Sequence, residues 1–293
     1  MAESTHPPIV AGVDGSAASL DAVRWAARAA VRREAPLHLL HAADFSSLLA
    51  GILPPPEGME EVLERRGHRY LRVARELAVA QGATEITQQL DAGRPAPALL
   101  ETSTAAGLVV VGSSGHGQLT TVLAGSVAAA VAAHAGCDTV IVRGDTWDEP
   151  GAARRPIVVG VDGGSASAQV LAAAFAEARA LHAPLVAVHA WADDPPRPEA
   201  DPHMDWQSLE IAGRKLLAEC IAEHEDGGVD VEQVVVRDHP RRELLDRSDD
   251  ARLVVIGRRG RGGFPGLALG STGQALLHHA ACPVLIVRTE SST

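Results

Sequence analysis

The fold is decided by one stretch, IVAGVDG at residues 9–15. It is a short continuous apolar run that ends in an Asp-Gly turn, and such a run is typical of a strand buried on both faces of a sheet. The pattern returns 148 residues later as IVVGVDG at residues 157–163. The recurrence predicts that the chain carries this strand and its turn twice.

The internal repeat extends through both halves of the chain. Residues 108–112 (LVVVG) match residues 253–257 (LVVIG), but here the offset is 145. The smaller offset indicates that a loop or helix between fixed elements is three residues shorter in the second copy. A repeat of this length is a whole domain, because domains average about 150 residues. We therefore predict two domains, residues 1–145 and 156–293, joined by the polar stretch 144–155.

Each half alternates strand and helix patterns. Continuous apolar runs of strand length are separated by amphipathic stretches with helical spacing. Because strands separated by helices call for a parallel sheet covered on both faces, with right-handed crossovers, the pattern predicts an α/β fold. In the first half we expect strands at 9–13, 37–41, 85–90, 108–111 and 139–142 and helices at 17–33, 58–81, 96–104 and 126–135; the second half repeats this order and closes with a strand at 284–287.

The composition limits the classes of partner. The 293 residues include 26 Lys and Arg against 37 Asp and Glu, a formal net charge of −11, and aromatic residues make up only 3%. Nucleic-acid binders need a basic surface to neutralise phosphates and, for single strands, aromatic rings that stack on bases. We therefore expect no nucleic-acid partner. Hydrophobic residues at 46% and charged residues at 22% are typical of a soluble globular protein.

The cysteines and the N-terminus are typical of a cytoplasmic protein. The three cysteines are too few for a disulfide scaffold and include no CxxC pair. The N-terminal residues 1–8 lack the positive start and the apolar run of a signal peptide. Residues 102–137 contain no Asp, Glu, Lys or Arg, but glycines interrupt this segment, so it would insert poorly into a bilayer. We expect a cytoplasmic location without membrane insertion.

An aspartate follows the first strand of each copy, Asp14 in the first half and Asp162 in the second. Ligands of open α/β sheets bind beyond the carboxyl ends of the strands, where the strand order reverses. A carboxylate there can accept hydrogen bonds from ribose hydroxyls or help to hold a metal near phosphates. It can also cap the following helix or shape its turn without any ligand. The recurrence leaves both interpretations open, because an inherited folding constraint would also repeat.

A glycine loop with the pattern G-x2-G-x9-G-S follows the fourth strand of each copy. Glycines let the backbone approach a ligand closely, and a Gly-Ser pair at a helix start offers amide groups and a hydroxyl to an anion such as phosphate. The alternative is a loop followed by a serine cap, with no ligand. Two copies with matching spacing, each paired with an aspartate after the first strand, favour a nucleotide. The residues are Gly112, Gly115, Gly125 and Ser126 in the first copy and Gly257, Gly260, Gly270 and Ser271 in the second.

This motif is similar to the ATP-binding motif of the universal stress protein family. The resemblance covers essentially the whole chain as a tandem, two-domain member, and residues 258–271 are particularly similar to the family's loop. It implies two doubly wound, Rossmann-like domains, each with a five-stranded parallel sheet in the order 3-2-1-4-5. It also implies one ATP in each domain, accompanied by Mg²⁺, over the ends of strands one and four.

The resemblance further implies roles for particular residues. Asp14 and Asp162 would lie near the ribose, and the backbone at Ala42 and Ala190, after the second strand, would lie against adenine. The glycines and serines of the two loops would surround ribose and phosphates. The last strand of each copy resembles the edge strand through which domains of the family pair. Whether these strands pair within one chain or also form a homodimer is left open.

The two glycine loops differ in charge. The second loop carries Arg258, Arg259 and Arg261 where the first carries Ser113, Ser114 and His116. The arginines either screen phosphate charge or are only solvated loop residues. If they screen phosphates, the second site should hold a nucleotide at least as tightly as the first.

The common catalytic motifs are absent from the sequence. No GxxxxGK[ST] loop, GxSxG elbow or HExxH helix occurs, and no GxGxxG follows the first strand. The only lysine, Lys215, falls in a predicted amphipathic helix and is expected to face solvent. His134 and the pair 278–279 lie in predicted helices without a paired ligand pattern, and Cys137 and Cys282 are expected to be core thiols. We therefore assign no catalytic residue and no metal-ligating residue.

Three interpretations of function follow. The leading one is a nucleotide-binding regulatory protein in which ATP biases the conformation or the choice of a protein partner. The resemblance adds roles in stress response and growth control. The alternative is an enzyme, a slow Mg-dependent ATPase or autophosphorylating protein with Asp14 or Asp162 near the metal, and its weak point is the lack of an evident general base. The third is a scaffold with vestigial sites, which predicts no thermal shift with ATP.

Overall fold

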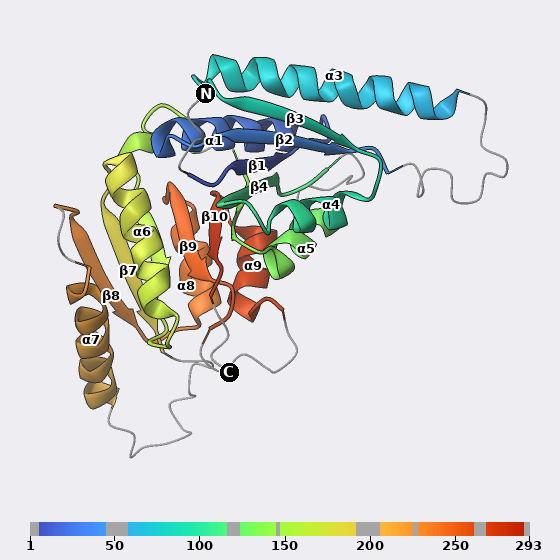
Figure 1. Cartoon of the computed structure of the whole chain (residues 1–293). Coiled ribbons are helices and arrows are strands. Elements are labelled where there is room, and N and C mark those ends of the chain that lie inside the picture. Colours follow the sequence, from blue (N-terminus) through green and yellow to red (C-terminus); the bar gives the residue numbers. More distant parts are fainter. Residues whose placement is uncertain are drawn as a thin grey trace. The chain divides into compact units, whose positions relative to one another are not determined.

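The structure is a computed structural model that describes residues 6–44, 58–115, 124–144, 147–191, 206–224, 228–260 and 268–289. The chain divides into two compact units, Met1–Val142 and Arg143–Thr293. Strands and helices alternate along each unit (Figure 1). The prediction of two tandem α/β domains is therefore confirmed, and the borders 1–145 and 156–293 stay predictions.

The first domain follows the predicted order of elements. Every element agrees with its expected range within one or two residues at each end, which is the accuracy with which such ends are defined. The strands are β1 (Ile9–Gly12), β2 (Leu37–Ala42), β3 (Ile86–Asp91), β4 (Leu108–Gly112) and β5 (Asp138–Val142). The helices are α1 (Ala17–Arg33), α3 (Met59–Ala80), α4 (Pro95–Thr102) and α5 (Ser126–His134).

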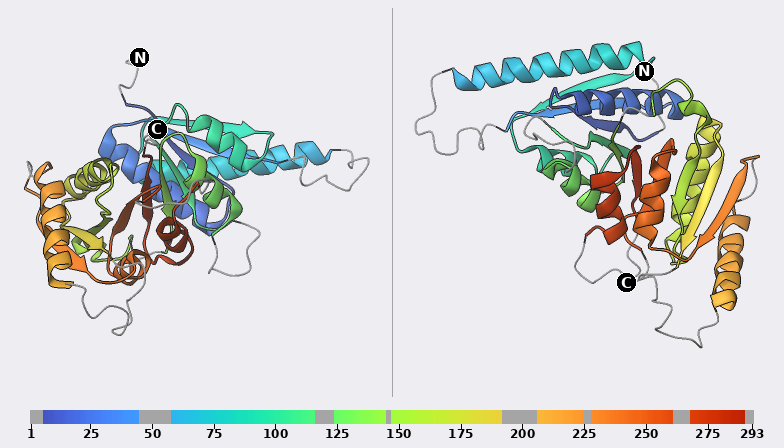
Figure 2. Two further views of the ribbon diagram at one scale, coloured as in Figure 1. Left: turned by 90° about the horizontal axis from the view of Figure 1, so that it is seen from below. Right: turned by 180° about the vertical axis from the view of Figure 1, so that it is seen from behind.

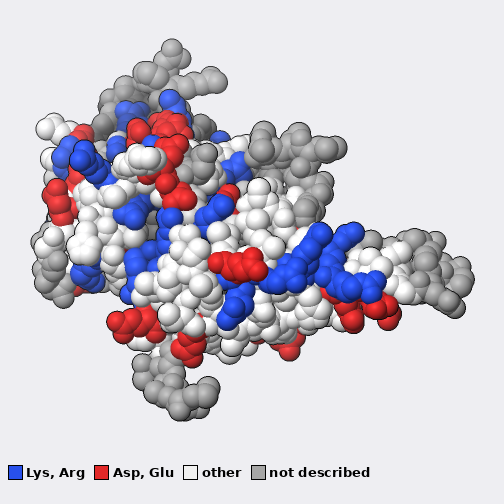
Figure 3. All heavy atoms as spheres, turned by 90° about the horizontal axis from the view of Figure 1, so that it is seen from above, with Lys and Arg blue, Asp and Glu red and all other residues white. Residues whose placement is uncertain are grey.

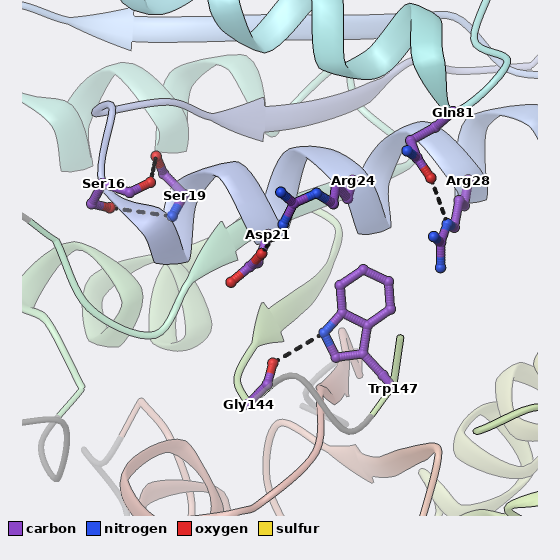
Figure 4. A network of polar contacts seen from close by, with 8 residues as sticks. All are labelled: Ser16, Ser19, Asp21, Arg24, Arg28, Gln81, Gly144 and Trp147. Atoms are coloured by element: carbon purple, nitrogen blue, oxygen red, sulfur yellow. Dashed lines mark hydrogen bonds and ion pairs between the residues drawn. The ribbon is translucent and has the colours of Figure 1, made fainter. Parts of the chain in front are cut away.

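The second domain repeats this order. The change of offset falls between its second and third strands, where α7 has 17 residues and its counterpart α3 has 22. In the stretch before the first strand, the Trp147 indole donates a hydrogen bond to the Gly144 carbonyl at 3.1 Å (Figure 4). The strands are β6 (Ile157–Gly160), β7 (Leu185–Ala190), β8 (Val231–Val236), β9 (Leu253–Gly257) and β10 (Val284–Val287). The helices are η1 (Ala152–Arg154), α6 (Ser167–Leu181), α7 (Trp206–Ala222), α8 (Pro240–Ser248) and α9 (Ser271–His279).

The strand order in each domain is the one that the resemblance implies. It is β3-β2-β1-β4-β5 in the first domain and β8-β7-β6-β9-β10 in the second, with parallel pairing inside each domain. The chain moves outward from β1 to β2 and β3 and then returns to place β4 on the other side of β1. The order therefore reverses between β1 and β4, and likewise between β6 and β9. The doubly wound fold is confirmed.

Helices cover both faces of the sheet, as Figures 1 and 2 show for the first domain, with α1 and α3 on one face and α4 and α5 on the other. The central strands are consequently buried on both sides. Ile9, Val10 and Ala11 of β1 are at most 1% exposed, and Val109 and Val110 of β4 are fully buried. Burial on both faces explains why these strands are continuous apolar runs rather than alternating patterns.

Helix α1 begins directly after the Asp-Gly turn. Ser16 is its N-cap, and the Ser16 hydroxyl accepts a hydrogen bond from the Ser19 amide at 3.2 Å (Figure 4). Further along, the Arg28 guanidinium donates to the Gln81 side-chain oxygen at 2.7 Å, which connects α1 to the residue after α3. The start of α1 is thus fixed by a side-chain cap, the usual way to satisfy an amide of the first turn.

The helices α3 and α7 differ in surface charge although they occupy equivalent places. Figure 3 shows basic side chains gathered along α3. In α7 the basic residues are Arg214 and Lys215, and both pair with glutamates of the same helix. In α3 Arg65 likewise pairs with Glu61, so the difference lies in the number of exposed basic side chains, five on α3 and two on α7. The exposed arginines of α3 are Arg65, Arg66, Arg69, Arg72 and Arg75.

The uncharged segment 102–137 is part of the first domain. It supplies strand β4 and helix α5, and buried residues of both contribute to the core. Among the residues that the structure describes, no helix is both long enough and apolar enough to cross a membrane.

Candidate functional site

Two loops meet at the carboxyl edge of the sheet in each domain. Strands β1 and β4 are neighbours, with Ala11 opposite Val110, so the turn after β1 and the loop after β4 leave the sheet side by side. Strands β6 and β9 pair in the same way, with Val159 opposite Val255. Because the strand order reverses here, this is the edge at which open α/β sheets bind ligands.

The carboxylate of Asp14 lies between its own turn and the loop after β4. Its Oδ1 accepts hydrogen bonds from the Ser16 amide at 2.9 Å and from the Ser16 hydroxyl at 2.6 Å. Its Oδ2 lies against Gly115, where an added Cβ would be 2.5 Å from that oxygen. Position 115 therefore accepts only glycine while the carboxylate stays in this place. One oxygen shapes the turn, as the ligand-free interpretation expects, and the other faces the predicted ligand loop.

Asp162 repeats this division of its two oxygens. Oδ1 accepts hydrogen bonds from the Gly164 amide at 2.8 Å and from the Ser167 hydroxyl at 3.0 Å. Oδ2 lies against Gly260, where an added Cβ would be 3.0 Å away. The aspartate and the loop glycine that the sequence analysis singled out separately are thus in direct proximity in both domains.

A backbone hydrogen bond joins the two ends of each glycine loop. The Gly125 amide donates to the Ser113 carbonyl at 2.7 Å, and the Gly270 amide donates to the Arg258 carbonyl at 3.0 Å. These glycines are the N-caps of α5 and α9 and provide no side-chain cap, so Ser126 and Ser271 open helices whose first amides attract anions. The loop interiors 116–123 and 261–267, with His116 and Arg261, lie outside the described residues.

The remaining predicted residues lie at strand ends. Gly112 packs against α1, since an added Cβ would be 2.6 Å from the Ala18 carbonyl oxygen. Gly257 faces α6 less tightly, with Val170 3.2 Å from an added Cβ. Both glycines therefore serve helix packing, whatever else they contact. Ala42 and Ala190 end β2 and β7, the strands on the opposite side of β1 and β6 from the glycine loops.

Sequence reasoning missed the contribution of the helix that follows the second strand. The Tyr70 ring of α3 covers the Asp-Gly turn, because an added Cβ on Gly15 would be 2.4 Å from its Cε1. In the second domain Leu216 of α7 covers Gly163, with the corresponding distance 2.5 Å. The available signal was a glycine inside the helix, followed three residues later by a large side chain, in both copies.

The candidate nucleophiles and metal ligands lie elsewhere. Cys282 is fully buried, and this burial raises the pKa of its thiol to about 12, while Cys137 is 8% exposed. Lys215 is exposed on α7 with its Nζ 3.8 Å from Glu219. His134 lies in the last turn of α5. Across the described ranges of the chain, no three His, Cys, Asp or Glu side chains gather as a metal site would require.

Fold and site together define a tandem α/β protein of the doubly wound class with a paired aspartate and glycine loop in each domain. The sequence matches the universal stress protein family twice, over residues 6–143 and 153–288. The chain belongs to the universal stress protein family.

Individual relatives agree with this assignment. Universal stress protein Rv2623 from Mycobacterium tuberculosis is 36% identical over 290 residues, with 96% of each chain covered. Universal stress protein Rv2005c from the same species is 35% identical over 286 residues, again with 96% of each chain covered. The crystal structure of a universal stress protein from Archaeoglobus fulgidus shares the fold, with a TM-score of 0.72 at 17% identity over 98% of this chain and 97% of that one.

Proposed function

We propose that each domain binds one ATP, together with Mg²⁺, and that occupancy of the two sites regulates a protein partner in stress response or growth. One repeated observation carries the proposal. In both domains an oxygen of the aspartate after the first strand lies against a glycine of the loop after the fourth strand, Asp14 on Gly115 and Asp162 on Gly260. The edge of the sheet where this occurs is the one where such folds bind nucleotides.

The residues present suit the parts of ATP. Ribose hydroxyls can donate hydrogen bonds to the Asp14 or Asp162 carboxylate, and phosphate oxygens can accept them from loop and helix-start amides beside Ser126 or Ser271. Adenine would then lie against the backbone at Ala42 or Ala190. In each domain the three contacts come from neighbouring strands of one sheet.

The donor chemistry of the site also suits Mg²⁺. This ion is commonly held by one or two carboxylates together with substrate phosphates and water, and it neutralises phosphate charge. Asp14 and Asp162 each bring one carboxylate to the edge of the sheet. In the described residues no larger acidic cluster accompanies them. A magnesium ion carried in with the nucleotide is therefore the expected form.

A regulatory role follows from the chemistry of the site. Phosphoryl transfer relies on cationic groups at the phosphates and on a base that positions the nucleophile. The single lysine of the chain pairs with Glu219 on α7. The cations available to the phosphates are therefore Mg²⁺ and, in the second loop, Arg258 and Arg259, and the sequence offers no evident base that would position a nucleophile. ATP can regulate the protein by binding one conformation more tightly than another. A difference in partner affinity between the ATP-bound and ATP-free protein is the expected readout.

Identification of the small molecules that the purified protein carries tests the proposal. Mass spectrometry of the supernatant after denaturation should detect intact ATP, and calorimetry on the emptied protein should resolve two sites. Asp14→Ala and Asp162→Ala should each weaken one site at least about tenfold, since hydrogen bonds to charged groups contribute about 1.5–3 kcal/mol. Asp21→Ala is the matched control, because Asp21 is an α1 carboxylate that pairs with Arg24 and belongs neither to the turn after β1 nor to the loop after β4.

The same titration separates the alternatives. Steady release of phosphate that both site variants abolish would replace the regulatory proposal with the ATPase. If ATP neither binds nor shifts the thermal unfolding midpoint, the interpretation as a scaffold with vestigial sites would remain.

Location and assembly form part of the same proposal. We propose that the protein is cytoplasmic and binds its protein partner there. Cell fractionation measures in which compartment the protein is found. Sedimentation with and without Mg-ATP measures whether the chain forms the homodimer that the sequence leaves open. A change of mass on ATP addition would identify a second copy of the chain as a nucleotide-controlled partner.

A further inference from the structure

His41 and His189 recur with the same contacts, yet they take no part in the proposed ATP contacts. Nδ1 of His41 lies 2.6 Å from the Val13 carbonyl oxygen, and Nδ1 of His189 lies 2.8 Å from the Val161 carbonyl oxygen. Because a carbonyl oxygen only accepts, Nδ1 carries the donated hydrogen in both rings. Both histidines are buried, with 8% of each exposed.

This hydrogen bond lies where the ladder between the first two strands ends. The pairing of β1 with β2 ends with Gly12 opposite Leu40. The next residue, Val13, still donates its amide to the Leu40 carbonyl at 2.8 Å, and its own carbonyl accepts from His41. The residue directly before the aspartate is therefore held at both of its backbone polar groups by the second strand. The residue before Asp162 has the same two bonds.

The helix after the second strand is shaped around each histidine ring. An added Cβ on Gly67 of α3 would be 2.8 Å from Cδ2 of His41, and one on Gly213 of α7 would be 3.2 Å from Cδ2 of His189. The Tyr70 ring packs edge-on against His41 with the centroids 5.4 Å apart. Close packing on this side and the carbonyl on the other leave the imidazole one orientation.

We infer that His41 and His189 are positioning residues for the two sites. Each holds the backbone before the aspartate, and the aspartate then presents Oδ2 to the loop glycine. The histidines act through Asp14 and Asp162 and contact no nucleotide. The consequence for ATP affinity rests on the proposed function, whereas the geometric role does not.

Amide hydrogen exchange tests the geometric role without any nucleotide. The Ser16 amide donates to Asp14 and the Gly164 amide donates to Asp162, so their exchange reports on the two carboxylates. His41→Leu removes the donor while keeping an apolar side chain, and exchange at Ser16 should rise at least about fivefold, the worth of one lost hydrogen bond. Exchange at Gly164 should not change, because that amide belongs to the other domain. His189→Leu should give the reverse result.

His41→Asn and His189→Asn are the matched controls. The asparagine amide nitrogen can occupy the place of Nδ1 and donate to the same carbonyl, so slow exchange should be retained. The asparagine proteins also keep the test valid if the leucine proteins do not fold, because exchange in them can be compared directly with the wild type. Unchanged exchange at Ser16 in folded His41→Leu, or an equal rise in His41→Asn, would overturn the inference.

A double-mutant cycle then tests the link to ATP. His189→Leu should weaken ATP binding at the second site about five- to tenfold, the effect of losing one buried hydrogen bond, and His189→Asn should restore most of it. In the Asp162→Ala background His189→Leu should cause no further loss, because it acts through that carboxylate. Additive losses would overturn the inference. A wild type that binds no ATP would instead refute the proposed function, and the exchange data would still decide the role of the histidines.

Discussion

The two candidate sites share their backbone arrangement and differ in the side chains around it. Both have an aspartate against a loop glycine and a buried histidine behind the strand end. Tyr70 covers the turn in the first domain and Leu216 covers it in the second, and the loops begin with serines at 113–114 and with arginines at 258–259. The shared aspartate, loop glycine and histidine are held by main-chain hydrogen bonds and close backbone contacts. We therefore expect both sites to bind the same class of ligand, but with different affinities.

The aspartates show how the same restraint is built in two ways. In both domains Oδ1 accepts hydrogen bonds from one amide and one hydroxyl. Ser16 supplies both groups to Asp14, whereas Gly164 and Ser167 supply them to Asp162. The serine is the cap of α1 in the first case and the first residue of α6 in the second. Two different sequences thus fix the carboxylate in the same orientation toward its loop.

The largest expected effect concerns the turns under Tyr70 and Leu216. Gly15 has φ +82, and its added Cβ would meet the rigid Tyr70 ring at 2.4 Å, so Gly15→Ala should destabilise the first domain by about 2–4 kcal/mol from backbone strain and overpacking. Gly163→Ala should cost about 1–2 kcal/mol, because the Leu216 side chain is flexible and the overpacking smaller. Urea unfolding followed by circular dichroism measures both.

Gly58→Ala is the control that separates the backbone strain at positive φ from the steric clash with Tyr70 or Leu216. Gly58 has φ +78, and among the residues that the structure describes nothing lies within 4 Å of an added Cβ, so its substitution should cost only about 1 kcal/mol. Equal losses for Gly15→Ala and Gly58→Ala would show that the Tyr70 contact contributes nothing.

The second effect concerns the loop glycines. Gly115→Ala would place a Cβ 2.5 Å from the Asp14 carboxylate and Gly260→Ala one 3.0 Å from the Asp162 carboxylate. The carboxylate must then leave its hydrogen bonds, so ATP affinity should fall about tenfold in the first domain and about threefold in the second. The control is Gly115→Ala in the Asp14→Ala background, where the carboxylate that the new Cβ would meet is gone and little further loss is expected. Calorimetry that finds the full loss again in the Asp14→Ala background would refute the role of the Asp14 contact.

The sequence was sufficient to predict the fold and the proximity of the turn after β1 to the glycine loop after β4. Apolar runs such as 9–13 and 108–111 identify buried parallel strands, and neighbouring parallel strands end at one edge, which brings Asp14 to Gly115. The place of Tyr70 was not predictable, because helical periodicity identifies the apolar face of α3 but not its rotation and shift against the sheet. The bond from His41 to Val13 depends on the register of β2 against β1 and on the orientation of the imidazole ring, which the apolar pattern of the strands does not specify.

The third effect is a pH dependence of stability that we expect from Cys282 in the second domain. Burial raises the pKa of the Cys282 thiol from 9.0 to about 12. Between these values the unfolded thiol is ionised and the folded one is not, so the unfolded state binds fewer protons and stability falls as pH rises. The contribution of the neutral Cys282 thiol to the free energy of unfolding is fully present below pH 9, and about 1.4 kcal/mol of it should be lost by pH 10.

Urea unfolding at pH 8 and pH 10 measures this loss. Cys282→Ala should remove that part of the alkaline decline. Cys137→Ala, the corresponding change in the first domain, controls for the lost packing of a sulfur atom. An unchanged decline in Cys282→Ala would contradict the assignment.

The smallest expected effect concerns the charge of the second loop. Arg259 is exposed and Arg258 is half-buried. Replacing both by serine copies the first loop, and the backbone bonds of residue 258 to Val287 and Gly270 can persist because they involve only main-chain atoms. Surface charges contribute little and are screened by salt, so ATP affinity of the second domain should fall only about two- to threefold at low salt.

The number of phosphates on the nucleotide distinguishes the two roles that Arg258 and Arg259 can have, namely screening of phosphate charge and shaping of the loop. If they act on phosphate charge, the double substitution Arg258→Ser and Arg259→Ser should weaken ATP more than AMP, and the difference should shrink as the salt concentration rises toward 1 M, where the Debye length is about 3 Å. The reciprocal protein, Ser113→Arg with Ser114→Arg, should strengthen ATP binding in the first domain by a similar factor. Equal effects on ATP and AMP, independent of salt, would mean that the arginines shape the loop and that the two sites differ in conformation rather than in charge.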